Sequence, residues 1–142
     1  MAKVPSPARI LVVDDSMLVR EGIRLFIEMH TDWKVCGEAE NGKKAIAMAE
    51  TLKPDLVILD LSMPIMNGLD AAKGISAIFP SMPMIMFTLH YSHTLLKQAH
   101  LVGISHVFSK GDGLGENVLK AMSAMLVTNS QSNSQERQGF AS

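Results

Sequence analysis

Five polar side chains stand at the ends of apolar stretches in this sequence and together could support phosphoryl chemistry. Asp14 and Asp15 end "ILVVDD", Asp60 ends "LVILD", Thr88 ends "MPMIMFT" and Lys110 ends "SHVFSK". Clustered carboxylates suit a hard cation such as Mg²⁺, which also binds phosphate oxygens. A carboxylate can attack phosphorus to give an acyl phosphate. With a hydroxyl and an ammonium added, the set contains the groups that phosphoryl transfer needs to position reactants and neutralise oxygens.

This chemistry requires the five side chains to converge, and the pattern of elements explains how they could. The apolar runs are short, bounded by turn or polar residues, and typical of strands. The central runs lack alternating polar residues, which favours a parallel sheet covered on both faces. The predicted strands are residues 9–13, 33–39, 55–60, 82–88 and 105–110.

Helix-period patterns separate these runs. They cover residues 17–30, a segment after Asn41-Gly42, a segment from Gly68 to Pro80, residues 92–101 and a last segment around residues 118–126. Alternating strands and helices predict a doubly wound α/β fold with helices on both faces of the sheet. In such sheets, ligands bind outside the carboxyl ends of the strands. We therefore expect the five polar side chains on one rim.

Composition limits the class of protein. The chain has 142 residues, 47% hydrophobic and 19% charged, with a formal net charge of −1. These values predict one domain with a substantial core and give no support for a nucleic-acid surface. Cys36 is the only cysteine, and no stretch approaches the ~20 apolar residues of a membrane span, so we expect a soluble cytoplasmic protein. Residues 1–8 are predicted to be a flexible segment, 9–127 the domain, and 128–142 a disordered tail or linker stub.

The order and spacing of these motifs resemble the receiver domain of two-component response regulators. The resemblance runs from about Arg9 to Val127 and rests on the acidic pair, "DLSMPIMNG" from Asp60, Thr88 and Lys110. "TLH" at residues 88–90 resembles the receivers that usually carry a helix-turn-helix output domain. The resemblance implies a flavodoxin-like five-stranded parallel sheet in the order 2-1-3-4-5. It also implies a histidine kinase or histidine phosphotransfer protein as partner and a possible homodimer. The near-neutral charge and the lack of a long apolar stretch predict neither nucleic-acid binding nor membrane association by this chain itself.

The resemblance also implies a metal site. Asp15 and Asp60 would ligate Mg²⁺ directly, together with the backbone carbonyl of Ser62. Asp14 would act largely through a bound water. Asp60 would be the phosphoacceptor.

Two further residues would respond to the phosphoryl group. By the resemblance, Lys110 would pair with it and Thr88 would hydrogen-bond to it. The family usually has Tyr or Phe three residues before the lysine as a rotating switch aromatic, but Val107 stands there. Strand alternation places the neighbouring Phe108 on the opposite face, so the usual coupling from Thr88 to an aromatic is in question.

These residues predict a phosphoacceptor that hydrolyses its phosphoryl group slowly and is not a multiple-turnover enzyme. Three other functions compete with this interpretation. A haloacid-dehalogenase-type phosphatase needs a second acid two residues after the nucleophile, where Ser62 stands. A flavodoxin-like FMN binder would have its phosphate repelled by Asp14 and Asp15. A receiver-like interaction module that signals without phosphorylation is favoured by Val107 and opposed by the intact phosphoryl-binding residues.

Overall fold

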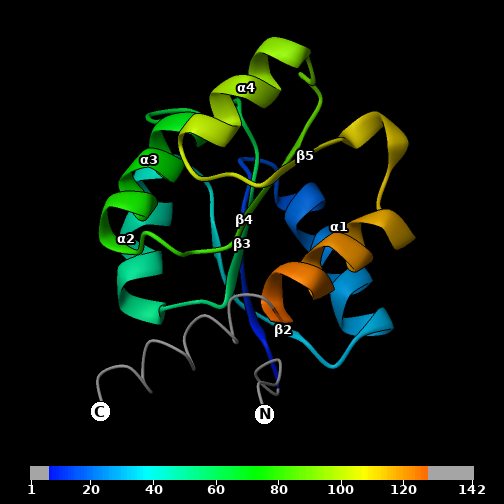
Figure 1. The fold of residues 1–142 in the computed structure, drawn as a ribbon. Coiled ribbons are helices and arrows are strands. Elements are labelled where there is room, and N and C mark those ends of the chain that lie inside the picture. The colour runs from blue at the N-terminus through cyan, green and yellow to red at the C-terminus, as the bar shows by residue number, and fades with distance from the viewer. Residues whose placement is uncertain (1–6, 128–142) are drawn as a thin grey trace, which may run out of the picture.

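The computed structural model describes residues 7–127 and contains one parallel sheet with helices on both faces (Figure 1). The strand order is β2-β1-β3-β4-β5, and all four neighbouring pairs are parallel. The predicted α/β class and strand order are therefore confirmed. The predictions for residues 1–6 and 128–142 lie outside the described residues. The strands are β1 (Arg9–Val13), β2 (Lys34–Ala39), β3 (Leu56–Leu59), β4 (Met84–Thr88) and β5 (His106–Ser109).

The helices fall where the periodicity predicts them. A final helix occupies residues 116–127 of the described chain. No helix within residues 7–127 is long and apolar enough to cross a bilayer. The others are α1 (Met17–His30), α2 (Gly42–Leu52), α3 (Gly68–Ile78), α4 (His93–Leu101) and the short 3₁₀ helix η1 (Lys110–Asp112).

Several strands are shorter than predicted because their last residues serve other roles. Asp60 lies just beyond β3, and its own Oδ1 accepts a hydrogen bond from the backbone N–H of Leu61 at 2.7 Å. Lys110 does not end β5 but begins η1, after Ser109 caps that turn. Local side-chain hydrogen bonds accompany the end of each strand at these positions, and apolar patterning does not reveal them.

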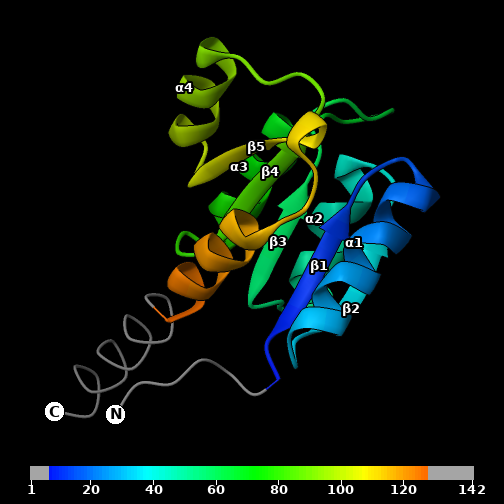
Figure 2. The same ribbon diagram turned by 90° about the vertical axis from the view of Figure 1, so that its right-hand side faces the viewer.

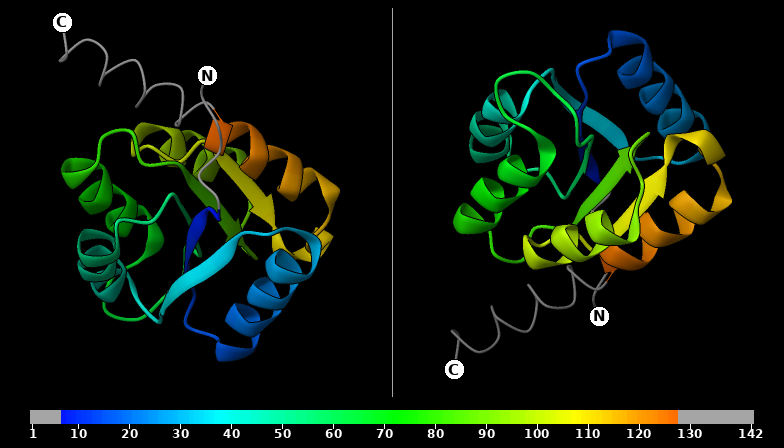
Figure 3. Two further views of the ribbon diagram at one scale, coloured as in Figure 1. Left: turned by 90° about the horizontal axis from the view of Figure 1, so that it is seen from below. Right: turned by 90° about the horizontal axis from the view of Figure 1, so that it is seen from above.

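The core consists of two apolar layers, one on each side of the sheet. Alternate residues of each strand face opposite layers: Leu11 and Val13 pack with α2, α3 and α4, whereas Ile10 and Val12 pack with α1 and residues 116–127. Figure 2 faces the side that carries α1 and residues 116–127, and Figure 3 shows the two groups of helices on opposite sides of the sheet. Burial on both faces explains why the central strands are continuously hydrophobic.

Four helices begin with short polar caps close to the carboxyl ends of the strands. Ser16, Asn41, Asn67 and Ser92 each accept a hydrogen bond from the backbone N–H three residues on. Such side chains satisfy one of the unpaired N–H groups of the first turn and typically stabilise a helix by about 1 kcal/mol. The chain therefore turns sharply from strand to helix, which leaves the strand-end side chains at an accessible rim.

The loop after Asp60 is held close to that residue. Gly68 donates its N–H to the carbonyl of Leu61 at 2.8 Å, and a Cβ at position 68 would lie 2.0 Å from the backbone oxygen of Asp60. Within the loop, Ile65 has a φ of 69°, and the N–H of Met66 donates to the carbonyl of Pro64 at 2.7 Å. Ile65, a β-branched residue, therefore lies in a strained γ-type turn. The close approach of position 68 to the backbone oxygen of Asp60 makes glycine necessary at position 68.

We therefore expect Gly68→Ala to lower the free energy of unfolding by about 1–3 kcal/mol, because a methyl group cannot fit against the Asp60 carbonyl. Gly22→Ala is the matched control, since a Cβ on that glycine in α1 meets nothing within 4 Å. The control should raise stability by roughly 0.5–1 kcal/mol through helix propensity. Urea unfolding of both variants tests this, and equal stability of Gly68→Ala and the native protein would contradict the packing argument.

Candidate functional site

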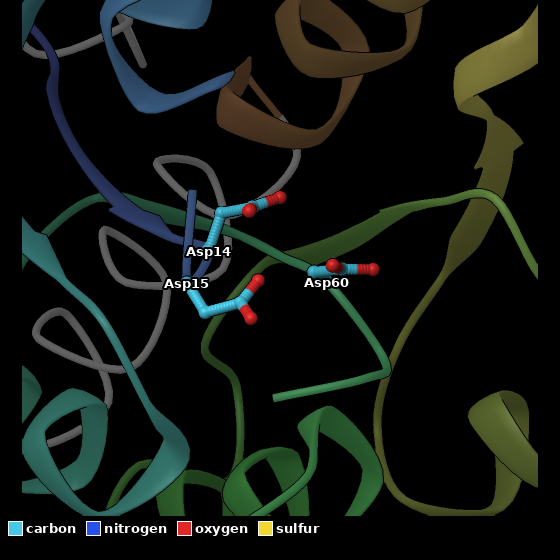
Figure 4. A group of neighbouring side chains, drawn as sticks. All are labelled: Asp14, Asp15 and Asp60. Atoms are coloured by element: carbon cyan, nitrogen blue, oxygen red, sulfur yellow. The ribbon is translucent and has the colours of Figure 1, made fainter. Parts of the chain in front are cut away.

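Three carboxylates meet at the carboxyl edge of the two central strands. Asp14 and Asp15 follow β1, Asp60 follows β3, and these strands are neighbours. Each residue offers one carboxylate oxygen, and these three oxygens lie within 4.8 Å of one another (Figure 4). Parallel pairing brings the strand ends together, and the N–H of Asp60 donates to the carbonyl of Val13 at 2.9 Å. The structure thus brings Asp60 next to an acidic pair that lies 45 and 46 residues earlier in the chain.

The three carboxylates differ in environment. Asp14 and Asp60 are 1% and 6% exposed, whereas Asp15 is exposed. The two buried groups are held through both oxygens: Asp14 accepts from Ser16 N–H at 2.9 Å and from Lys110 at 2.7 Å, and Asp60 accepts from Leu61 N–H and from Lys110 at 3.1 Å. Within residues 7–127, no hydrogen bond or ion pair holds the Asp15 side chain.

Burial and charge determine the proton affinities in this cluster. Burial raises the pKa of Asp14 above its ordinary value, although the hydrogen bonds from Lys110 and Ser16 oppose that rise. Burial by itself would lower the pKa of Lys110, but its bonds to Asp14 and Asp60 outweigh burial and leave that pKa raised. Lys110 therefore stays protonated at neutral pH. One ammonium against three carboxylates leaves a formal charge of −2.

This donor set fits Mg²⁺. Three hard oxygen donors from separate positions converge, and the cluster carries uncompensated negative charge. Mg²⁺ binds through one or two carboxylates and retains several waters, so the exposure of Asp15 is compatible with a partly hydrated ion. Asp14, Asp15 and Asp60 are the residues that could hold it. Ser62 lies in the exposed loop two residues after Asp60, and its carbonyl as a ligand stays a prediction.

Thr88 lies at the same edge, but no hydrogen bond within residues 7–127 joins its side chain to the cluster. It is the last residue of β4, fully buried, and its Oγ1 accepts a hydrogen bond from His90 N–H at 3.2 Å. In the sheet it pairs with Ser109, the residue before Lys110. Thr88 is thus next to the lysine segment and tied to the loop that leads into α4, so its response to a phosphoryl group stays a prediction.

No aromatic side chain replaces the switch residue at position 107. Val107 packs against the core layer formed with α2, α3 and α4, whereas Phe108 packs against the opposite layer. The Phe108 ring also stacks on His106, with ring centroids 5.9 Å apart. The prediction that Phe108 faces away from Val107 is confirmed.

Sequence reasoning missed the direct contact between Lys110 and Asp14. These residues are 96 positions apart, and the motif alone paired the lysine with a phosphoryl group. The backbone N–H groups of Ser16 and Leu61 were also missed as donors to the carboxylates. Their signal was available, since Asp often accepts from the N–H one or two residues on, at turns and helix starts.

The chain matches the response regulator receiver domain over residues 10–122. The transcriptional regulatory protein YdfI of Bacillus subtilis (strain 168) is 40% identical over 93 residues, which is 66% of this chain and 44% of that protein. A protein-glutamate methylesterase/protein-glutamine glutaminase of Idiomarina loihiensis is 44% identical over 80 residues, 56% of this chain and 20% of that protein. This chain therefore spans less than half the length of these relatives.

Among solved structures, a LuxR-family two-component response regulator from Aurantimonas sp. SI85-9A1 has a TM-score of 0.80 and 31% identity. That comparison covers 85% of this chain and 86% of the other. The likeness extends over most of the fold.

We expect Lys110→Met to destabilise the protein at neutral pH by about 2 kcal/mol or more, because it leaves Asp14 and Asp60 buried without their cation. The loss should shrink as the pH falls. Without Lys110, the pKa of Asp14 in the folded protein rises further above its value in the unfolded chain. A carboxyl group with a raised folded-state pKa costs no stability below its unfolded-state pKa. It lowers the free energy of unfolding as the pH rises from there through the folded-state pKa. Urea unfolding between pH 4 and about pH 8 measures this.

Lys120→Met is the matched control, since the one ion pair of Lys120 among the described residues is an exposed pair with Glu116. Exposed pairs of this kind contribute little, so this variant should unfold like the native protein at every pH. A Lys110→Met deficit that is the same at acid and neutral pH would refute the electrostatic account.

Proposed function

The chain belongs to the response regulator receiver family, and on that premise we propose that Asp60 accepts a phosphoryl group in a two-component phosphorelay. The proposal rests on the position of Asp60, which lies between the ammonium of Lys110 and the acidic pair Asp14-Asp15. Its carboxylate lies 3.1 Å from the ammonium of Lys110 and shares a cluster with the acidic pair Asp14-Asp15. A nucleophile, a cation for phosphoryl oxygens and a metal-binding acid pair are the groups that acyl phosphate formation requires.

In the proposed reaction, a carboxylate oxygen of Asp60 attacks the phosphorus of a phosphohistidine. The new O–P bond forms as the N–P bond breaks, and the imidazole leaves. Lys110, already hydrogen-bonded to Asp60, compensates the charge that arrives. Bound Mg²⁺ would supply further neutralisation of the phosphoryl oxygens. Attack of water on the same phosphorus later releases inorganic phosphate and restores the carboxylate, so each phosphoryl group is used once.

Phosphorylation would then act as a local switch. The phosphoryl group adds roughly −1.5 to −2 charges and three acceptor oxygens. The Thr88 hydroxyl, which now accepts from His90 N–H, can donate to those oxygens and thereby alter the loop into α4. Since Val107 offers no aromatic ring, we propose that the signal travels through this β4–α4 loop instead.

Exposed apolar residues around the rim support a protein as phosphodonor. They come from three segments that border the carboxyl edge: the start of α1, the loop after Asp60 and the loop after β4. Single exposed apolar residues are unremarkable, but a group around a charged site is typical of a protein contact. We propose that a histidine kinase or histidine phosphotransfer protein docks here, in the cytoplasm. The residues and their exposures are Met17 (69%), Leu18 (80%), Ile65 (78%), Leu89 (70%) and Tyr91 (44%).

We expect incubation with acetyl phosphate and Mg²⁺ to add one phosphoryl group per chain, detected by intact-mass spectrometry and removed by hydroxylamine, which cleaves acyl phosphates. Asp60→Asn should abolish the adduct because the amide is a poor nucleophile. Asp70→Asn, an exposed acid in the first turn of α3, is the matched control and should retain it. A native protein that forms no adduct would favour the interaction module, and continuous turnover of phosphate esters would favour the phosphatase.

A second expectation concerns Mg²⁺ itself. Because an ion that binds only the folded state stabilises it, Mg²⁺ at about 100 times its Kd should raise the free energy of unfolding by about 2.7 kcal/mol. Asp15→Asn should remove most of this gain without lowering metal-free stability, since Asp15 is exposed, forms no hydrogen bond or ion pair among residues 7–127, and repels the neighbouring carboxylates. Urea unfolding with and without Mg²⁺ provides both values. Full Mg²⁺ stabilisation of Asp15→Asn would exclude Asp15 as a ligand.

A further inference from the structure

Arg20 reaches back from the first turns of α1 to the acidic loop. Its Nη1 donates to the backbone carbonyl of Asp14 at 2.6 Å, and its Nε donates to Glu38 Oε1 on β2 at 3.0 Å. The side chain is only 14% exposed. A planar guanidinium with donors on different nitrogens can hold both acceptors at once, which a single ammonium cannot do in the same fixed geometry. Arg20 therefore fastens the β1–α1 turn to the edge strand.

The consequence falls on Asp15. Both polar groups of the Asp14 backbone are held, since its N–H donates to the carbonyl of Ala39 at 3.0 Å and its carbonyl accepts from Arg20. That carbonyl belongs to the peptide plane joining Asp14 to Asp15, and a peptide plane moves as a unit. No side-chain contact within the described residues holds the Asp15 carboxylate, so its direction depends on this plane.

We propose that Arg20 is a positioning residue for the metal site, which orients Asp15 by holding the Asp14–Asp15 peptide. The inference rests on the proposed function, in which Asp15 contributes to Mg²⁺ binding. Residues that hydrogen-bond to metal ligands without binding the metal themselves commonly lower the metal affinity by about 10- to 100-fold when they are replaced. Here the contact passes through the backbone rather than through the ligand side chain.

Arg24 provides a matched control within the same cluster. It lies one turn further along α1 and donates to Glu38 Oε2 through Nε at 3.2 Å and through Nη2. The hydrogen bond from Arg24 is the main reason that the pKa of Glu38 is lowered, with a smaller contribution from Arg20. Both arginines thus share one carboxylate, but among the described residues only Arg20 also contacts the Asp14 backbone.

The sign of the effect separates positioning from simple charge. Removing a positive charge near a cation site strengthens cation binding by electrostatics alone. Loss of the peptide clamp weakens binding instead. Arg20→Met removes both charge and clamp, whereas Arg20→Lys keeps the charge and loses the two-acceptor geometry.

The test is an NMR titration with Mg²⁺ that follows backbone amide shifts in the native protein and in Arg20→Met, Arg20→Lys and Arg24→Met. Urea unfolding without Mg²⁺ is measured beside it for each variant. We expect Arg20→Met to weaken Mg²⁺ binding about tenfold, Arg20→Lys to show a smaller loss in the same direction, and Arg24→Met to stay within about twofold of native. If Arg20→Met does not fold, Arg20→Lys against Arg24→Met decides the question.

Two results would overturn the inference while leaving the proposed function intact: unchanged or tighter Mg²⁺ binding by both Arg20 variants, or equal losses in the Arg20 and Arg24 variants. If the native protein itself shows no Mg²⁺-dependent shifts, the proposed function fails and the inference fails with it.

Discussion

The crowding of three carboxylates at one edge of the sheet is the constraint on which the rest of this structure depends. Two unit charges about 4 Å apart interact with roughly 4 kcal/mol at an effective dielectric constant of 20, which is comparable with the whole stability of a typical domain. Lys110 compensates part of this repulsion by donating hydrogen bonds to both Asp14 and Asp60. The fold tolerates the repulsion between the carboxylates because Lys110, which is 96 residues from Asp14 and 50 residues from Asp60 in the sequence, neutralises part of their negative charge.

The sheet topology makes this arrangement accessible. β1 and β3 lie side by side at the centre, so that their carboxyl ends deliver Asp14, Asp15 and Asp60 to one place. The helices begin almost at once, through polar caps such as Ser16, and the loop after Asp60 is packed so tightly that Gly68 has no room for a side chain. The acids thus follow directly on the strands of the sheet, whereas the surrounding rim, formed by the start of α1 and the loops after Asp60 and β4, exposes apolar side chains.

Chemistry and signal output are separable in this receiver. The residues that would bind and transfer a phosphoryl group are present, but the usual aromatic switch is absent: Val107 fills one core layer, and Phe108 is committed to the other by packing and by its stack on His106. Thr88 is bonded to the loop before α4. Rotation of a ring at position 107 is not available, since the two strand faces cannot be exchanged without breaking the sheet register. The proposed conformational response therefore begins from the loop before α4.

Apolar periodicity and turn residues act over a few positions, so they are enough to predict the alternation of strands and helices, the parallel sheet, and the placement of Asp14, Asp60 and Thr88 at strand ends. The motifs also carry the resemblance to receiver domains. Three features became visible in the folded chain: Lys110 bonds to Asp14, Arg20 holds the Asp14 carbonyl, and β5 ends before Lys110. Those features depend on which strands become neighbours and on which long side chains can span the space between them. Neither is encoded in any local pattern.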